Sequence, residues 1–63
     1  MNEYIEIYKK AFEEGIYLAY QDFLDNKKRK FKNIDYNILK PKIYDLGYIN
    51  GYYMFYNIIK NHL

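Results

Sequence analysis

Apolar side chains recur three and four residues apart along two stretches of this sequence, and this spacing constrains the fold more than any other feature. In the first stretch the recurring positions are Tyr4, Ile5, Tyr8, Ala11, Phe12, Gly15, Ile16, Ala19 and Phe23. Such a period places them along one side of an α-helix. Asn2 is suited to cap the amino end, and Asn26 can adopt the left-handed conformation that ends helices. We therefore predict an amphipathic helix over about residues 2–26.

The second stretch predicts another helix over about residues 41–61, which begins near Pro41 because proline is tolerated in a first helical turn. Its recurring apolar positions are Ile43, Tyr44, Gly47, Tyr48, Gly51, Tyr52, Phe55, Ile58 and Ile59. Further apolar residues lie outside this stripe, among them Leu46, Ile49, Tyr53 and Tyr56. The second helix is therefore apolar on nearly every side and needs packing partners on more than one side.

Small residues occupy every fourth position within both stripes. They are Ala11, Gly15 and Ala19 in the first helix and Gly47 and Gly51 in the second. A glycine inside a helix costs roughly 1 kcal/mol relative to alanine, so another interaction should offset this cost. We expect helix packing, because small residues allow a second backbone or a large ring to approach. The alternative is a groove for a ligand or a partner side chain, which we favour less because both rows lie within the apolar stripes.

The two stretches also resemble each other at an offset of 36 residues, which places Tyr8 over Tyr44 and Gly15 over Gly51. At 3.6 residues a turn this offset is about ten turns, so matched positions share a helical phase. Internal duplication and chance similarity in a tyrosine-rich chain both stay open as explanations.

The connection over residues 27–40 carries the most distinctive charge pattern. It begins with the basic run Lys27, Lys28, Arg29, Lys30, Phe31 and Lys32. This run could contact nucleic acid by charge, with Phe31 stacked on a base. It could instead be a solvated turn or attract the acidic half of the chain, because residues 1–26 carry a net charge of −4 and residues 27–63 one of +6. Asp35 can cap a short helix through Leu39, which would avoid a long structureless loop.

With 63 residues the chain forms one domain, 1–63, and buries only about 60% of the surface that its unfolded form exposes. Small domains usually add disulfides, a metal or oligomerisation. The chain has no cysteine and one histidine, His62, so we expect no zinc site and no cofactor. The fold class we predict is all-α. It is a helical hairpin of two long amphipathic helices, with or without a short helix between them, that pairs as a homodimer into a helical bundle.

Catalytic residues are not indicated. The sequence contains neither serine nor threonine, and tyrosine has an unperturbed pKa of about 10 and no identifiable activating partner here. We therefore predict that the protein is not an enzyme. Asp22 falls at a stripe position and has two interpretations. It is either a buried carboxylate that orients another group or, as we prefer, a charge near a helix end that reaches water or pairs with a lysine or a tyrosine hydroxyl.

Four tyrosines outside the small-residue rows are predicted to be exposed, and they are Tyr17, Tyr20, Tyr53 and Tyr56. Tyrosine is enriched at binding hot spots, so these residues predict a contact with a protein partner or between two copies of the chain. We expect a small protein-binding module. Its small size and its richness in Asn, Lys, Ile and Tyr, whose codons are rich in A and T, suggest an inhibitor of a host or defence enzyme, carried by a phage or mobile element. The alternative is a nucleic-acid-binding regulator that uses the basic run.

No stretch of the sequence approaches the roughly 20 apolar residues of a membrane span, and no basic amino-terminal stretch precedes an apolar signal core. We therefore expect a cytoplasmic protein without a membrane partner.

Overall fold

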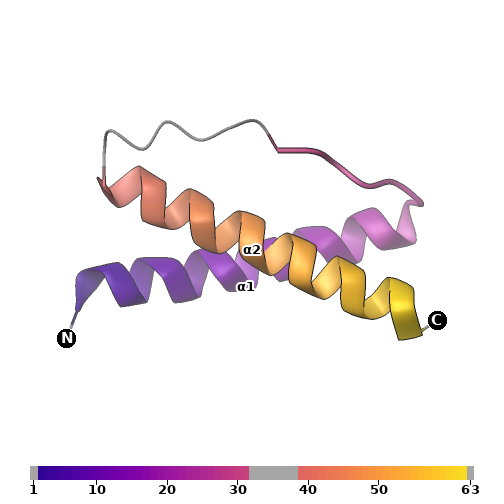
Figure 1. The fold of residues 1–63 in the computed structure, drawn as a ribbon, viewed down its shortest axis with the longest axis horizontal. Coiled ribbons are helices and arrows are strands. Elements are labelled where there is room, and N and C mark those ends of the chain that lie inside the picture. The colour runs from indigo at the N-terminus through magenta and orange to yellow at the C-terminus, as the bar shows by residue number, and fades with distance from the viewer. Residues whose placement is uncertain (1, 32–38, 63) are drawn as a thin grey trace.

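The computed structural model describes residues 2–31 and 39–62, which contain two α-helices (Figure 1). Helix α1 spans Glu3–Leu24 and helix α2 spans Leu39–His62. The helices pack against each other, so the prediction of an all-α fold with two long packed helices is confirmed. Neither helix is long and apolar enough to cross a lipid bilayer.

Hydrogen bonds at both ends of α1 explain where this helix begins and ends. The Asn2 side chain accepts a hydrogen bond from the backbone N–H of Tyr4 at 2.9 Å and caps the amino end. At the other end Asn26 has a φ of 62°, and the N–H of Lys27 donates to the carbonyl of Asp22 at 2.9 Å. This left-handed residue followed by a backward hydrogen bond is a Schellman motif. It turns the chain back toward the helices.

Helix α2 begins two residues before the predicted start at Pro41. Proline costs no helical hydrogen bond there, because the N–H groups of the first four helical residues have no partner within the helix. The described part of the connection, residues 25–31, contains no helix, and we call it the return segment. The short helix predicted to begin at Asp35 starts outside the described residues.

The two helices run in the same direction and cross at an angle, with both amino ends toward the same end of the molecule (Figure 1). Contacts agree with this direction, because Gly47 lies beside Tyr8 near the start of each helix and Tyr56 lies beside Phe23 near the end of each helix. A helical hairpin in the strict sense has antiparallel helices. The structure therefore has the paired helices of the predicted hairpin in a parallel arrangement, and residues 25–31 run back along the helices from the end of α1 (Figure 1).

Small residues meet where the helices cross. The buried small residues at the crossing are Ala11, Gly15, Ala19, Gly47 and Gly51. A Cβ atom added to Gly15 would overlap the carbonyl oxygen of Tyr48, and one added to Gly51 would overlap the carbonyl oxygen of Phe12. Because the neighbouring atoms belong to the backbone, the helices could admit a side chain at either glycine only by moving apart.

These two backbone contacts are equivalent under the 36-residue offset found in the sequence. The offset matches Gly15 with Gly51 and Phe12 with Tyr48. In the structure each glycine lies against the carbonyl of the matched aromatic residue on the other helix. Two parallel helices related by a local two-fold axis would make such a reciprocal pair. The sequence similarity thus corresponds to a symmetric arrangement at the crossing.

Close backbone approach leaves room for only a thin apolar core. Among the described residues the buried apolar side chains are those of Ala11, Ala19 and Tyr52. Larger apolar residues that stay exposed are Tyr4, Ile5, Tyr17, Tyr20, Leu24, Tyr44, Met54 and Ile58. Contiguous exposed apolar surface on a small protein often marks an interaction site.

Candidate functional site

A buried carboxylate lies between the two helices and the return segment. Only 1% of Asp22 is exposed, and Arg29 donates two hydrogen bonds to it, from Nε to Oδ2 at 2.8 Å and from Nη2 to Oδ1 at 3.2 Å. The Tyr52 hydroxyl donates a third, to Oδ2, at 2.7 Å. We call Asp22, Arg29 and Tyr52 the Asp22 cluster. Both carboxylate oxygens accept hydrogen bonds, so the buried charge is satisfied within the fold.

The Asp22 cluster holds the return segment against α2 together with one aromatic side chain. The backbone N–H of Arg29 donates to the Tyr52 hydroxyl at 2.9 Å. Phe31 packs edge to face with three tyrosines, and the ring centroids lie 6.0 Å from Tyr48, 5.1 Å from Tyr52 and 5.7 Å from Tyr53. The segment is thus fixed at Arg29 by hydrogen bonds and at Phe31 by ring packing.

The electrostatics of the Asp22 cluster favour one protonation state. Hydrogen bonds from Arg29 hold the pKa of Asp22 below its usual value of 3.8, against the opposing effect of burial, and the Tyr52 hydroxyl lowers it further. The same hydrogen bond to Asp22 raises the pKa of Arg29, and burial raises the pKa of Tyr52. At neutral pH the cluster is therefore an ion pair with a neutral phenol, which suits it to holding the chain rather than to transferring protons.

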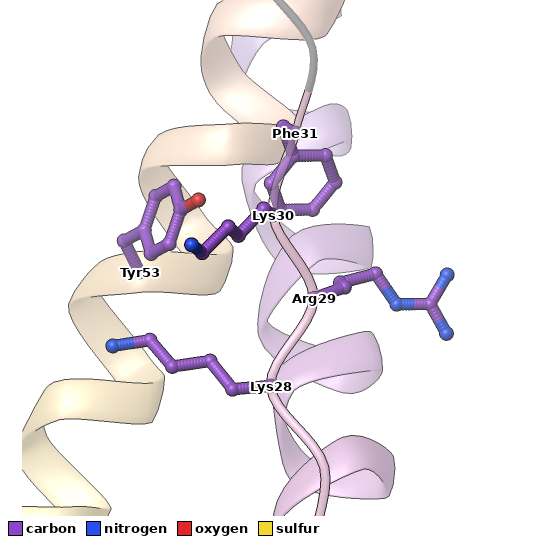
Figure 2. A pocket seen from close by; sticks show the side chains of 5 residues that line it. All are labelled: Lys28, Arg29, Lys30, Phe31 and Tyr53. Atoms are coloured by element: carbon purple, nitrogen blue, oxygen red, sulfur yellow. The ribbon is translucent and has the colours of Figure 1, made fainter.

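A hollow of about 510 Å³ opens between the return segment and α2. Its lining residues are Lys28, Arg29, Lys30, Phe31 and Tyr53 (Figure 2). Figure 2 shows the amino groups of Lys28 and Lys30 on the same side as Tyr53, whereas the Arg29 guanidinium points to the opposite side. The Lys28 amino group lies 6.0 Å from the ring centroid of Tyr53. We call this site the lysine pocket.

The basic run predicted from the sequence therefore divides into parts with different contacts. Arg29 pairs with Asp22, and Lys27 lies 3.8 Å from the same carboxylate. Phe31 packs on three tyrosines, which accounts for this ring without a nucleic-acid base. Lys28 and Lys30 face the lysine pocket, and Lys32 lies outside the described residues.

The four tyrosines predicted to be exposed divide between the two helices. On α1 the exposed fraction is 74% for Tyr17 and 46% for Tyr20, and the neighbouring Leu24 is 62% exposed. At 100° a residue these three side chains share a side of α1 that faces away from the buried Gly15 and Ala19. We call Tyr17, Tyr20 and Leu24 the aromatic face.

On α2 the prediction of exposure is wrong for Tyr53 and Tyr56, because both are half-buried. Tyr53 contacts Phe31, and Tyr56 packs against Phe23 with ring centroids 6.1 Å apart. The Lys28 amino group also lies 5.4 Å from the Tyr56 ring. The return segment, whose path the sequence did not predict, covers this side of α2.

The two sequence interpretations of Asp22 are each confirmed in part, and the partner that they missed is Arg29. We preferred an aspartate that reaches water or pairs with a lysine or a tyrosine hydroxyl; the structure buries it and pairs it with Tyr52, with Lys27 and most directly with Arg29. One signal was available in the sequence, since Arg29 is the single arginine among the cations. A guanidinium matches the two oxygens of a carboxylate better than an ammonium does.

Groups of histidine, cysteine, aspartate and glutamate that could hold a metal ion do not occur in residues 2–31 and 39–62. His62 is exposed near the end of α2. The candidate functional site consists of two surfaces of different chemistry, the aromatic face on α1 and the lysine pocket beside α2.

Comparison of the chain with protein-family models, with curated proteins and with solved structures finds no significant match.

Proposed function

We propose that this protein is a protein-binding module and that it contacts its partner through the aromatic face of α1. The observation that carries the proposal is the exposure of Tyr17, Tyr20 and Leu24 on a side of α1 that does not pack against α2. Tyrosine gives a large, fairly rigid contact with a polar tip, and such residues dominate binding energy at protein interfaces.

The spacing of these residues supports a helix-mediated contact. Tyr17, Tyr20 and Leu24 stand three and four positions apart, which is the arrangement by which one helix face enters a hydrophobic groove of a partner. Glu13 and Ile16 border Tyr17 and line a shallow hollow with it, so the face has relief as well as apolar area. A flat or grooved apolar protein surface fits this chemistry.

In its most specific form the proposal is an inhibitor of a host or defence enzyme, carried by a phage or mobile element. Composition and small size support this form. The partner could also be a second copy of the chain, because the apolar core is thin and several large apolar residues are exposed. For a homodimer, sedimentation at micromolar concentration should give about twice the chain mass of 7.8 kDa.

The test is a crosslinking experiment followed by a binding measurement. A photoreactive phenylalanine analogue at position 17 should capture the partner in cells of the natural host, and the captured protein should then be purified. Alanine at Tyr17 or Tyr20 should weaken binding to it by about 1 kcal/mol or more, which is roughly fivefold in Kd. Isothermal titration calorimetry measures this difference, and circular dichroism checks that the variants stay folded.

Tyr4 provides a matched control, because it is a partly exposed tyrosine at the other end of α1, with 36% of the residue exposed. Tyr4→Ala should leave partner binding unchanged. Partner binding that is equally strong in Tyr17→Ala, Tyr20→Ala and the wild type would contradict the proposal. If the alanine variants instead halve the mass in sedimentation, the aromatic face serves the homodimer.

A further inference from the structure

The lysine pocket has features that the aromatic face does not explain. Lys28 and Lys30 extend from the same side of the return segment (Figure 2). Arg29, between them, points to the other side and is fixed on Asp22. Two ammonium groups are therefore directed toward the same hollow beside Tyr53 (Figure 2).

The backbone that carries these lysines is held in place. Arg29 anchors the return segment through its side chain to Asp22 and through its N–H to the Tyr52 hydroxyl, and Phe31 packs within the tyrosine cluster on α2. Lys28 and Lys30 flank the first anchor. Their charges are thus presented from a fixed backbone, which lowers the ordering cost that binding would otherwise require.

We propose that the lysine pocket binds an acidic segment of a protein, with one or two carboxylates placed between Lys28 and Lys30 and the adjoining chain resting on Tyr53. The proposal rests on the proposed function in one respect, that the ligand belongs to a protein, and it concerns a different surface from the aromatic face. A volume of about 510 Å³ is sufficient for one or two acidic side chains.

The described charges favour an acidic protein segment over nucleic acid. Nucleic-acid binding generally neutralises several phosphates along a backbone. In the return segment Arg29 is already paired with Asp22, Lys27 lies near the same carboxylate, and the Phe31 ring is packed on tyrosines. The remaining pair of ammonium groups matches a short, compact acidic group.

The experiment is an NMR titration of the full-length ¹⁵N-labelled chain with a short peptide of alternating glutamate and glycine. Amide shifts should concentrate at Lys28, Lys30 and Tyr53 and should shrink as salt is added, because the contacts are exposed ion pairs. A peptide with glutamine in place of glutamate should leave these amides unmoved. Equal shifts with the glutamine peptide would overturn the proposal.

Charge reversal supplies the matched variants. The double variant Lys28→Glu and Lys30→Glu should weaken peptide binding by about tenfold or more, since it replaces two attractions by repulsions. The control variant, Lys9→Glu and Lys10→Glu, changes the net charge equally but lies on the exposed surface of α1. Its affinity for the peptide should stay within about twofold of that of the wild type. Equal losses in the two double variants would show a general charge effect and would overturn the proposal.

A single-stranded oligothymidylate is the competing probe. If it binds the same amides more tightly than the acidic peptide at the same salt concentration, the pocket is a nucleic-acid site and the proposal is wrong. The outcome is independent of the crosslinking test at position 17, because the peptide titration uses no partner and no residue of the aromatic face. Failure of either proposal can therefore be recognised separately.

Discussion

Removal of a single hydroxyl group from Tyr52 tests whether the Asp22 cluster stabilises the fold. Tyr52→Phe keeps the ring, which is fully buried and packs against Phe31 and Tyr56. It removes the donor to Asp22 at 2.7 Å and the acceptor of the Arg29 N–H at 2.9 Å. A buried hydrogen bond to a charged group contributes roughly 1.5–3 kcal/mol, and we expect a loss of about 2 kcal/mol in the free energy of unfolding.

For a domain of this size each kcal/mol corresponds to about 4–8 °C in Tm, so Tyr52→Phe should melt roughly 8–16 °C below the wild type. Urea and thermal unfolding followed by circular dichroism measure both quantities. Tyr17→Phe is the matched control, because 74% of Tyr17 is exposed, and its effect should stay within about 0.5 kcal/mol. If Tyr52→Phe costs no more than this control, the cluster does not stabilise the fold and the reasoning is refuted.

Three further predictions follow from the packing and the charges. Gly15→Ala should lower Tm even though alanine favours a helix by about 1 kcal/mol, because its methyl group meets the backbone across the crossing; the exposed Asn57→Ala should not lower it. Asp22 has a pKa below its unfolded value, so it contributes stability above pH 3.8 that is lost as pH falls through the folded pKa. Asp22→Asn should therefore flatten the acid side of a pH–stability curve measured by urea unfolding. A hydrogen bond to Glu14 raises the pKa of Tyr44 to about 12, and ultraviolet titration of Glu14→Gln should show it shifted back toward 10.0.

Local sequence features were sufficient to predict the helices and their packing residues. The three-and-four spacing of apolar residues depends only on helical geometry, and Asn2 and Asn26 act through hydrogen bonds and dihedral angles of their own neighbourhood. Gly15 and Gly51 could be placed at a close contact because nothing else would offset their cost inside a helix.

The direction of the helices and the Asp22 cluster depend on contacts between distant residues, which spacing does not encode. An apolar stripe packs equally well on a parallel or an antiparallel neighbour, so the path of the connection decides the direction. That path depends on where Arg29 and Phe31 bind, and their partners Asp22 and Tyr52 belong to different helices. Treating the basic run as one surface therefore missed that its single arginine, Arg29, pairs with Asp22 within the fold.

The parallel arrangement has a consequence for how the chain folds. In an antiparallel hairpin the first contacts form beside the turn, between residues close in sequence, and later contacts extend from them. Here the hydrogen bond from Tyr52 to Asp22 joins residues 30 positions apart. The hydrogen bond from the Asn50 amide to the Tyr8 hydroxyl joins residues 42 positions apart in a chain of 63. Residues this far apart in sequence must be brought together before the helices can pack, so loop-closure entropy is lost before helix packing compensates for it. Folding should therefore be slower than is usual for a helical protein of this length, with a rate set by the same long-range closure that slows β-sheet proteins.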